Sequence, residues 1–173
     1  MTELKNNHIG AFQGHRIETI TLEREVYWLA AVFAASSTLH RLAPDEDDNE
    51  LDKLRLHFEI SEASRLLISV AVMLRNLMDA QSSEMLELSI RKMDMIVGHY
   101  TIGKKRRKKD LTFREACNKL IHALHINFDM AGMNKKKLCY LRPKVYLYGD
   151  FRDEDWRAVV DVTKFIKIAY RLS

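Results

Sequence analysis

The stretch from residue 48 to residue 79 constrains the fold most, because its apolar residues recur with the period of an α-helix over many turns. The repeat is clearest in its second half, at Leu67, Val70, Ala71, Leu74, Leu77 and Met78. Residues that recur at this period lie on one face of a helix, and that face is usually buried. Ile68 and Val72 widen the apolar face near its end, so we expect this helix to be central to the domain.

The same period predicts four more helices. They span residues 18–42, about 82–98, 113–124 and 153–172, the last with Asp153 as its N-cap. The chain contains only six Gly and two Pro in 173 residues, which favours long helices over a many-stranded sheet. Short connections between such helices are typical of antiparallel neighbours in an up-down bundle.

Residues 125–149 differ from the rest, because their apolar residues alternate at period two. Ile126–Met130, Leu138–Leu141 and Val145–Tyr148 read as strands, and Pro143 belongs on an edge or at a bulge. We therefore predict a mainly α fold, an up-down helical bundle of about five helices, with a small antiparallel β-hairpin or meander inserted before the last helix. The predicted single domain, 1–173, divides into a loose N-terminal arm (1–16), the bundle (17–124), the β-hairpin (125–149) and a C-terminal helix (153–172).

Positive charge is concentrated in one segment. The formal net charge is +4, with 28 basic and 24 acidic residues, and removing one run of six basic residues leaves 22 against 24, or −2. Such a run can attract phosphate backbones, although a solvated, mobile loop is the simpler interpretation. The candidate nucleic-acid-binding residues are Lys104, Lys105, Arg106, Arg107, Lys108 and Lys109.

Other features narrow the class of protein. The longest unbroken apolar run, Tyr27–Ala35, is nine residues, whereas a membrane span needs about 20. The polar N-terminus shows no secretory signal. Cys117 and Cys139 form no CxxC pair and read as buried, reduced thiols, so we expect a cytoplasmic protein with no membrane partner.

The predicted fourth helix carries the strongest candidate site. Thr112 and Glu115 have the spacing of a capping box, and Arg114, Asn118 and His122 follow one another at intervals of four along one flank. A basic group, an amide and an imidazole in one line can bind a phosphate, and His122 can act as general acid or base. The alternative is that these are ordinary flank residues, with His122 bonded to a nearby carbonyl.

Arg75 is the remaining candidate. It can pair with Asp79, four residues later on the long helix. This is either a solvent-facing ion pair at the helix end or an arginine directed toward His122, if the two helices are neighbours.

The segment Asn118-Lys-Leu-Ile-His122 resembles the signature of the HEPN superfamily. The resemblance implies a helical bundle, commonly a homodimer, and a metal-independent endoribonuclease of a defence or toxin–antitoxin system. It implies catalytic roles for His122 and Asn118, whereas the position of the family's arginine is occupied by Cys117. Arg75 or Arg114 would then have to stabilise the developing charge. A noncatalytic accessory protein with a degenerate site and a protein partner is the alternative interpretation.

Two further patterns bear on ligands. His122 and His125 can share a metal ion, but no carboxylate is placed to complete the site, so we predict no metal and no cofactor. On the strands, Tyr140, Tyr146 and Tyr148 alternate with basic residues such as Arg142 and Lys144. This mixture suits stacking on single-stranded nucleic acid, but a half-buried sheet face is the simpler interpretation.

Overall fold

The protein is an α+β structure in which helices pack on one five-stranded sheet. The computed structural model describes residues 19–42, 50–80, 95–103, 107–131, 140–152 and 154–173. In these ranges the helices are α1 (Thr19–Leu42), α2 (Glu50–Ala80), α4 (Phe113–Ile121) and α5 (Val162–Leu172). The strands are β1 (Ile96–Ile102), β2 (Lys109–Thr112), β3 (His125–Ala131), β4 (Tyr140–Phe151) and β5 (Glu154–Asp161).

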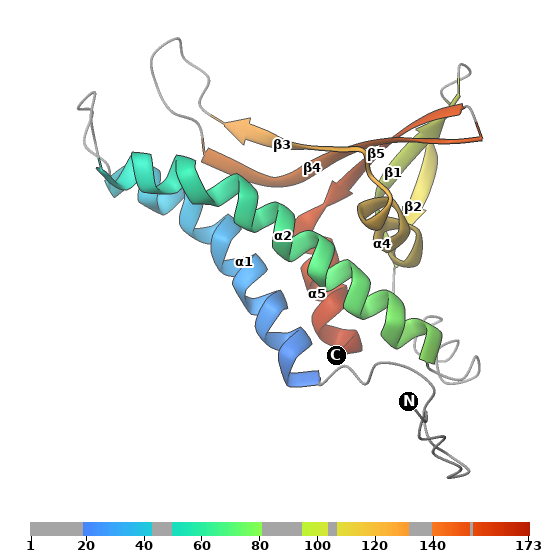
Figure 1. The fold of residues 1–173 in the computed structure, drawn as a ribbon, viewed down its shortest axis with the longest axis horizontal. Coiled ribbons are helices and arrows are strands. Elements are labelled where there is room, and N and C mark those ends of the chain that lie inside the picture. Colours follow the sequence, from blue (N-terminus) through green and yellow to red (C-terminus); the bar gives the residue numbers. More distant parts are fainter. Residues whose placement is uncertain (1–18, 43–49, 81–94, 104–106, 132–139, 153) are drawn as a thin grey trace, which may run out of the picture.

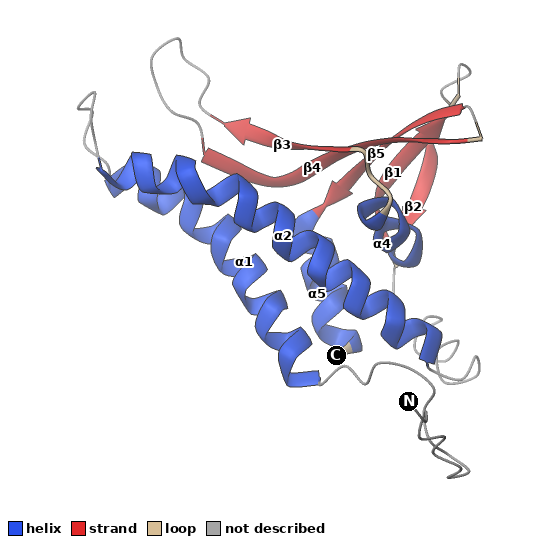
Figure 2. Ribbon diagram, in the orientation of Figure 1, coloured by secondary structure: helices blue, strands red, loops and turns tan. Residues whose placement is uncertain are grey.

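The sheet is antiparallel throughout, in the order β2-β1-β5-β4-β3. Figure 1 shows that all four helices lie on the same side of it, with α1 and α2 side by side and α4 near β1 and β2. Figure 2 shows the same two layers by colour, with no helix over the opposite side of the sheet in the described part of the chain. One face of the sheet therefore builds the core, and the other, the open face, is covered by none of the described helices.

The prediction of a mainly α bundle is wrong. Residues 96–102 form β1, although Ile96 and Val97 were assigned to a helix, and most of that helix lies outside the described residues. Residues 154–161 form β5 instead of the first turns of the last helix. The reason is a period of two that runs through β5: Trp156, Ala158 and Val160 are buried, while the residues between them are not.

The long helix, by contrast, forms as predicted. In α2 the side chains of Leu67, Val70, Ala71, Leu74 and Met78 are buried, and α1 packs along it. Full burial of a Val, Leu or Met side chain stabilises the folded state by about 1.5–3 kcal/mol. The predicted first helix is also present, and the predicted β segment forms the β3–β4 pair, joined by β5 at its other edge.

Polar side chains define where the two short helices begin. The Thr112 hydroxyl accepts a hydrogen bond from the Glu115 N–H at 3.4 Å, as the capping-box spacing predicts. The Asp161 carboxylate accepts one from the Lys164 N–H at 3.0 Å, so the last helix begins after Asp161; the predicted cap, Asp153, lies outside the described residues. Phe113 and Phe165, near the starts of these helices, are in ring contact at 5.0 Å in the core.

Candidate nucleic-acid interface

The open face of the sheet is built by strict alternation along three adjacent strands. On β4, Val145 and Leu147 point to the helices, so Tyr146 and Tyr148 point the other way and remain half-buried. On β5, Trp156 and Ala158 are buried and Arg157 between them is exposed. Successive side chains of a strand lie on opposite faces, so aromatic and basic groups gather on the side that no described helix covers.

The strand register places these side chains in two rows across the sheet. Directly paired residues of neighbouring strands share a face, and the pairs define the rows without gaps from β1 to β3. One row is His99, Val159, Tyr146 and Asn127, and the next is Thr101, Arg157, Tyr148 and His125. The two tyrosines therefore stand side by side at the middle of the open face.

Arg157 lies against both tyrosine rings. Its guanidinium carbon is 5.3 Å from the ring centroid of Tyr146 and 5.5 Å from that of Tyr148. A guanidinium within about 6 Å of a ring is attracted by the negative face of the ring. The three side chains thus form a cluster with flat surfaces and a positive charge.

Two lysines add to the positive charge around this cluster. Lys144, on β4, and Lys108, just before β2, line the same groove as Arg157. The pKa of His99 is held below its ordinary value of 6.5, mainly because burial disfavours the imidazolium and also because Lys108, Arg157 and Lys144 repel it. All three cations therefore lie near enough to His99 to disfavour its protonation.

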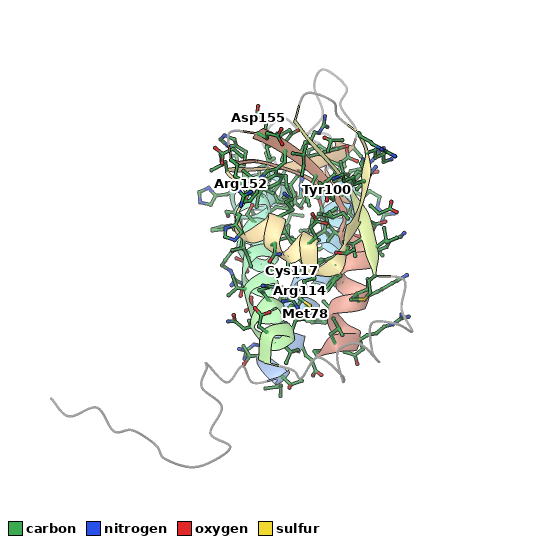
Figure 3. All side chains as sticks on the ribbon, turned by 90° about the vertical axis from the view of Figure 1, so that its right-hand side faces the viewer. Met78, Tyr100, Arg114, Cys117, Arg152 and Asp155 are labelled. Atoms are coloured by element: carbon green, nitrogen blue, oxygen red, sulfur yellow. The ribbon has the colours of Figure 1, made fainter. Side chains whose placement is uncertain are left out.

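Three acidic residues lie at one end of the open face. Asp150 and Asp155 pair across β4 and β5 next to the hairpin, and Glu154 lies beside them in sequence. Figure 3 shows Asp155 and Arg152 at this end of the sheet. Carboxylates also stand among the cations, because Asp110 pairs with His99 and Asp161 pairs with Lys144, so both signs of charge occur along the open face.

A groove follows the open face. It has a volume of about 1680 Å³ and is lined by residues of β1, β4 and β5, with His125 from β3 and Lys108 before β2. Sites for drug-sized ligands hold about 300–1,000 Å³, so this groove has room for several linked units of a polymer.

Contacts on the helix-covered face of the sheet hold β5 in position behind the cluster of Tyr146, Tyr148 and Arg157. The Trp156 indole N–H donates to the Asp150 carbonyl at 3.2 Å, and the Lys119 ammonium of α4 lies 4.1 Å from the Trp156 ring centroid. Burial lowers the pKa of Lys119 from its ordinary value, although the nearby Glu115 carboxylate partly opposes this shift. These contacts hold α4, β4 and β5 together, and so support the strands that carry the tyrosines.

The candidate catalytic residues of α4 do not converge on one point. Arg114 is at the start of the helix and His122 is its C-cap, so about 12 Å of helix separates them. The His122 backbone N–H donates to the Asn118 carbonyl at 3.0 Å; the His122 side chain is exposed, and Asn118 is half-buried. The predicted line of four-residue spacing exists, but it spreads these groups along the helix.

The two candidate arginines do meet, through a carboxylate. The Arg114 guanidinium Nη2 is 2.6 Å from Asp79 Oδ1, and Arg75 Nε is 3.2 Å from Asp79 Oδ2. Figure 3 shows Arg114 in the helical part of the molecule, below Cys117 and well away from Asp155. Asp79 therefore offsets part of the positive charge that the ribonuclease hypothesis required.

The basic run contributes one residue to the groove among those described. Lys104, Lys105 and Arg106 lie outside the described residues, and Arg107 is exposed. Lys108 lines the groove, whereas Lys109 begins β2 with its ammonium 6.0 Å from the Tyr100 ring centroid. The end of the run is thus part of an ordered strand pair, which an entirely mobile loop would not show.

Of the strand aromatics noted in the sequence, two reach the open face. Tyr140 instead contacts His40 of α1, with ring centroids 5.7 Å apart. Sequence reasoning missed Arg157 because β5 was read as helical, and it missed His99 because no strand was predicted after the helix that was expected to end near residue 98. The alternation of Trp156, Ala158 and Val160 is the signal that would have placed Arg157 on the same face as the tyrosines.

Cys117, which stands where the HEPN arginine would be, is fully buried, and burial raises the pKa of its thiol to about 12. We expect it to resist alkylation by iodoacetamide in the native protein and to react after unfolding, since the thiolate is the nucleophile. Mass spectrometry of the Cys117 peptide measures this directly. Rapid native labelling of Cys117 would contradict the burial described here.

Comparisons with known proteins do not assign the chain to a family: no family model matches it, and no curated protein or solved structure is significantly similar. Within the described ranges, no group of three His, Cys, Asp or Glu side chains is placed to bind a metal ion. None of the described helices is long and apolar enough to cross a membrane.

Proposed function

We propose that this protein binds single-stranded RNA across the open face of its sheet. The observation that carries the proposal is the cluster of Tyr146, Tyr148 and Arg157, flanked by Lys108 and Lys144, on the sheet face that the described helices leave bare. Sequence-tolerant binding of single strands combines aromatic stacking platforms with a positively charged groove. Here the tyrosines offer the stacking platform, and Lys108, Lys144 and Arg157 supply positive charge in a groove that also carries Asp150, Glu154 and Asp155.

The spacing of the aromatic groups suits a strand of nucleic acid. Tyr146 and Tyr148 are two residues apart on β4, which separates their Cα atoms by about 6.8 Å. Stacking of successive bases on aromatic rings contributes about 1–3 kcal/mol per base. Arg157 can stack on a base through its flat guanidinium or bind a phosphate, so it supports either contact.

The lysines and the acidic hairpin end also bear on the path of the bound strand. The acidic hairpin end, with Asp150, Glu154 and Asp155, repels phosphate, whereas Lys108 and Lys144 attract it. We therefore infer that the RNA crosses β1, β5 and β4 over the two tyrosines, between Lys108 and Lys144. Single-stranded DNA shares this chemistry, and a comparison of the two tests whether ribose hydroxyl groups add to the affinity.

Binding of fluorescent ten-nucleotide oligouridine, followed by anisotropy at several salt concentrations, tests the proposal. The variant Lys108→Gln/Lys144→Gln should bind more weakly, and its log Kd should depend on log salt with a slope smaller by about 1.4, or 0.7 per phosphate contact. Oligothymidine of the same length serves as the DNA comparison.

The control is Lys164→Gln/Lys167→Gln, which removes two exposed lysines from α5 in the helical layer. It changes the net charge by the same amount. It therefore distinguishes loss of contacts in the groove from a general loss of positive charge. Equal losses in the two double variants would reject the groove as the binding site, and no binding by the native protein would reject the function.

The affinity should also depend on pH through His99. In the free protein burial, together with repulsion by Lys108, Arg157 and Lys144, keeps its pKa below the ordinary value of 6.5, but a bound phosphate would stabilise the imidazolium. Binding then takes up a proton, so we expect affinity to rise as the pH falls below 6.5, and anisotropy in a series of buffers measures this. His99→Gln should flatten the rise, whereas His57→Gln, on α2, should not.

His99 should have the opposite effect on the stability of the free protein: as the pH falls, it should lower the free energy of unfolding. Because the folded-state pKa of His99 is lowered, the unfolded chain takes up a proton first as the pH falls below the ordinary value of 6.5. This group therefore reduces the free energy of unfolding in that range and contributes nothing above it. A binding curve that weakens in acid, with the fold intact, would contradict the role of His99.

RNA cleavage through His122 stays a prediction with less support than binding. Arg114 and Arg75 are both paired with Asp79, and Arg114 is at the opposite end of α4 from His122. If cleavage occurs by that route, His122→Ala should abolish it and leave the melting temperature nearly unchanged. Full cleavage by His122→Ala would rule the mechanism out.

A further inference from the structure

We propose that two copies of this chain associate through the outer faces of their α2 helices, which cross in antiparallel orientation. The supporting observation is a stripe of exposed apolar side chains on the longest helix. Its members are Leu51 (38% exposed), Leu54 (56%), Phe58 (56%), Ile68 (40%) and Val72 (39%). Isolated exposed apolar residues are common, whereas a row of five on one helix marks an interaction surface.

The stripe has the spacing of a helix-pairing seam. From Leu51 the positions advance by three, then four, to Leu54 and Phe58, and Ile68 and Val72 continue the same repeat. Positions that alternate by three and four form the seam between paired helices. On a helical wheel this seam is opposite the buried face that contains Leu66, Leu67 and Val70; nearer the N-terminus, Leu56 (42%) and Ile60 (44%) on the Leu67 side are exposed as well.

The centre of the stripe is polar but can be buried without an unpaired group. The Ser61 hydroxyl already donates to the Phe58 carbonyl at 2.9 Å. The Arg65 guanidinium donates to both carboxylate oxygens of Glu62, at 2.9 and 2.7 Å, and contacts Glu25 of α1 at 3.2 Å. A charged side chain that keeps its partners costs far less to bury than an isolated one.

Charges at the two ends of the stripe select an antiparallel second copy as the occupant. The N-terminal end carries the exposed Glu50, whereas the C-terminal end carries Arg75, Arg114 and their shared partner Asp79, a net charge of +1. An antiparallel arrangement brings opposite charges together at both ends. A parallel arrangement would place Glu50 against Glu50 and the positive ends against each other, and would also align the helix dipoles unfavourably.

The same arrangement matches the side chains along the seam. With the two-fold axis between Ser61 and Glu62, Leu51 meets Val72 of the second copy and Leu54 lies near Ile68. Phe58 then meets Arg65, a contact in which the guanidinium can lie over the ring. The residues of this surface and those of the sheet groove do not overlap, so the dimer would leave two separate RNA-binding faces free.

The expected dimer is weak. The stripe from Leu51 to Val72 is about 31 Å long, and one helix face of this length buries less than the ~800 Å² per partner of a standard interface. Trp28 of α1 (52% exposed) can extend it, because it lies one turn beyond Glu25, which contacts Arg65. We therefore expect a concentration-dependent monomer–dimer equilibrium.

Sedimentation equilibrium of the full chain over a wide concentration range tests association. The native protein should fit a monomer–dimer equilibrium, and Leu54→Glu/Ile68→Glu should raise the dissociation constant at least about 100-fold, because four carboxylates would enter the apolar seam. The matched control is Ile20→Glu, an apolar residue of α1 that is 71% exposed and outside the stripe. It should leave the equilibrium unchanged.

Disulfide trapping tests the orientation. In a background without Cys139, Ser61→Cys is near the two-fold axis and should form a disulfide with its copy, whereas Val72→Cys should not. A parallel pair would trap both. A native protein that is monomeric at all concentrations, or trapping at Val72 in preference to Ser61, would overturn the proposal. RNA binding by the monomeric variant would remain intact, so the two proposals fail independently.

Discussion

Replacing both open-face tyrosines, as Tyr146→Leu/Tyr148→Leu, is expected to lower the affinity for oligouridine at least about 30-fold. Each base that stacks on an aromatic side chain gains about 1–3 kcal/mol, so the loss of two stacks removes at least about 2 kcal/mol. Leucine keeps an apolar side chain on the strand but has no flat ring. The anisotropy assay measures the loss, and circular dichroism checks that the sheet is retained.

Two matched variants make this result specific. Tyr146→Phe/Tyr148→Phe keeps both rings, so it should bind nearly as well as the native protein if stacking is the main interaction. Tyr27→Leu/Tyr170→Leu removes two tyrosines that are 65% and 66% exposed on α1 and α5, and it should have no effect. If the phenylalanine variant loses as much affinity as the leucine variant, the tyrosines act through their hydroxyl groups and the stacking model is wrong.

Gly98→Ala is expected to destabilise the fold by about 3–5 kcal/mol, the range of severe single substitutions. A Cβ atom at this position would lie 1.9 Å from the Val159 carbonyl oxygen and 3.3 Å from the Val160 Cα. Both are backbone atoms of β5, so a side-chain movement cannot relieve the overlap and the β1–β5 pairing must open. Urea unfolding followed by tryptophan fluorescence measures the change in the free energy of unfolding.

Gly103→Ala provides the comparison. Its φ of +62° is unfavourable for alanine, but the nearest atom to a new Cβ is Glu154 Oε1 at 3.2 Å, at the end of a flexible side chain. This substitution should therefore cost only about 1–2 kcal/mol. Equal losses for the two glycines would show that β1 and β5 do not approach as closely as described.

The helices of this protein were predictable where one face is buried over many turns. The repeat from Leu67 to Met78 is long enough that no strand can satisfy it, and α2 is present with those residues in the core. The start of α4 was predictable for a local reason, because Thr112 and Glu115 form the cap within four residues of chain. Local hydrogen bonds and long periodic stretches are both visible in the sequence.

The strands were mispredicted where a segment is so short that its apolar residues fit both the strand period of two and the helical period of 3.6. Trp156, Val159 and Val160 can lie on one face of a helix, yet in the structure Trp156 and Val160 face the core and Val159 faces outward. The pairing of β5 with both β1 and β4 decides between the two readings, and those partners are distant in sequence. Tertiary hydrogen bonding thus overrode the local pattern.

In the candidate site, too, local patterns were visible in the sequence, whereas contacts between distant segments were not. Tyr146 and Tyr148 were visible as an aromatic and basic strand pattern, but their partner Arg157 was not, because it belongs to a different strand. The predicted site on α4 followed sequence spacing alone. Its side chains, Arg114, Asn118 and His122, are in the expected order along the helix without forming one cleft.

Photo-crosslinking of the native protein to oligouridine containing 4-thiouridine, with the crosslinked residues identified by mass spectrometry, tests the central claim most directly. We predict crosslinks on β4 and β5, at or next to Tyr146, Tyr148 and Arg157, that unlabelled oligouridine competes away. Crosslinks confined to the helical layer, for example at His122 or along α2, would contradict the claim that the bare side of the sheet is the RNA-binding surface.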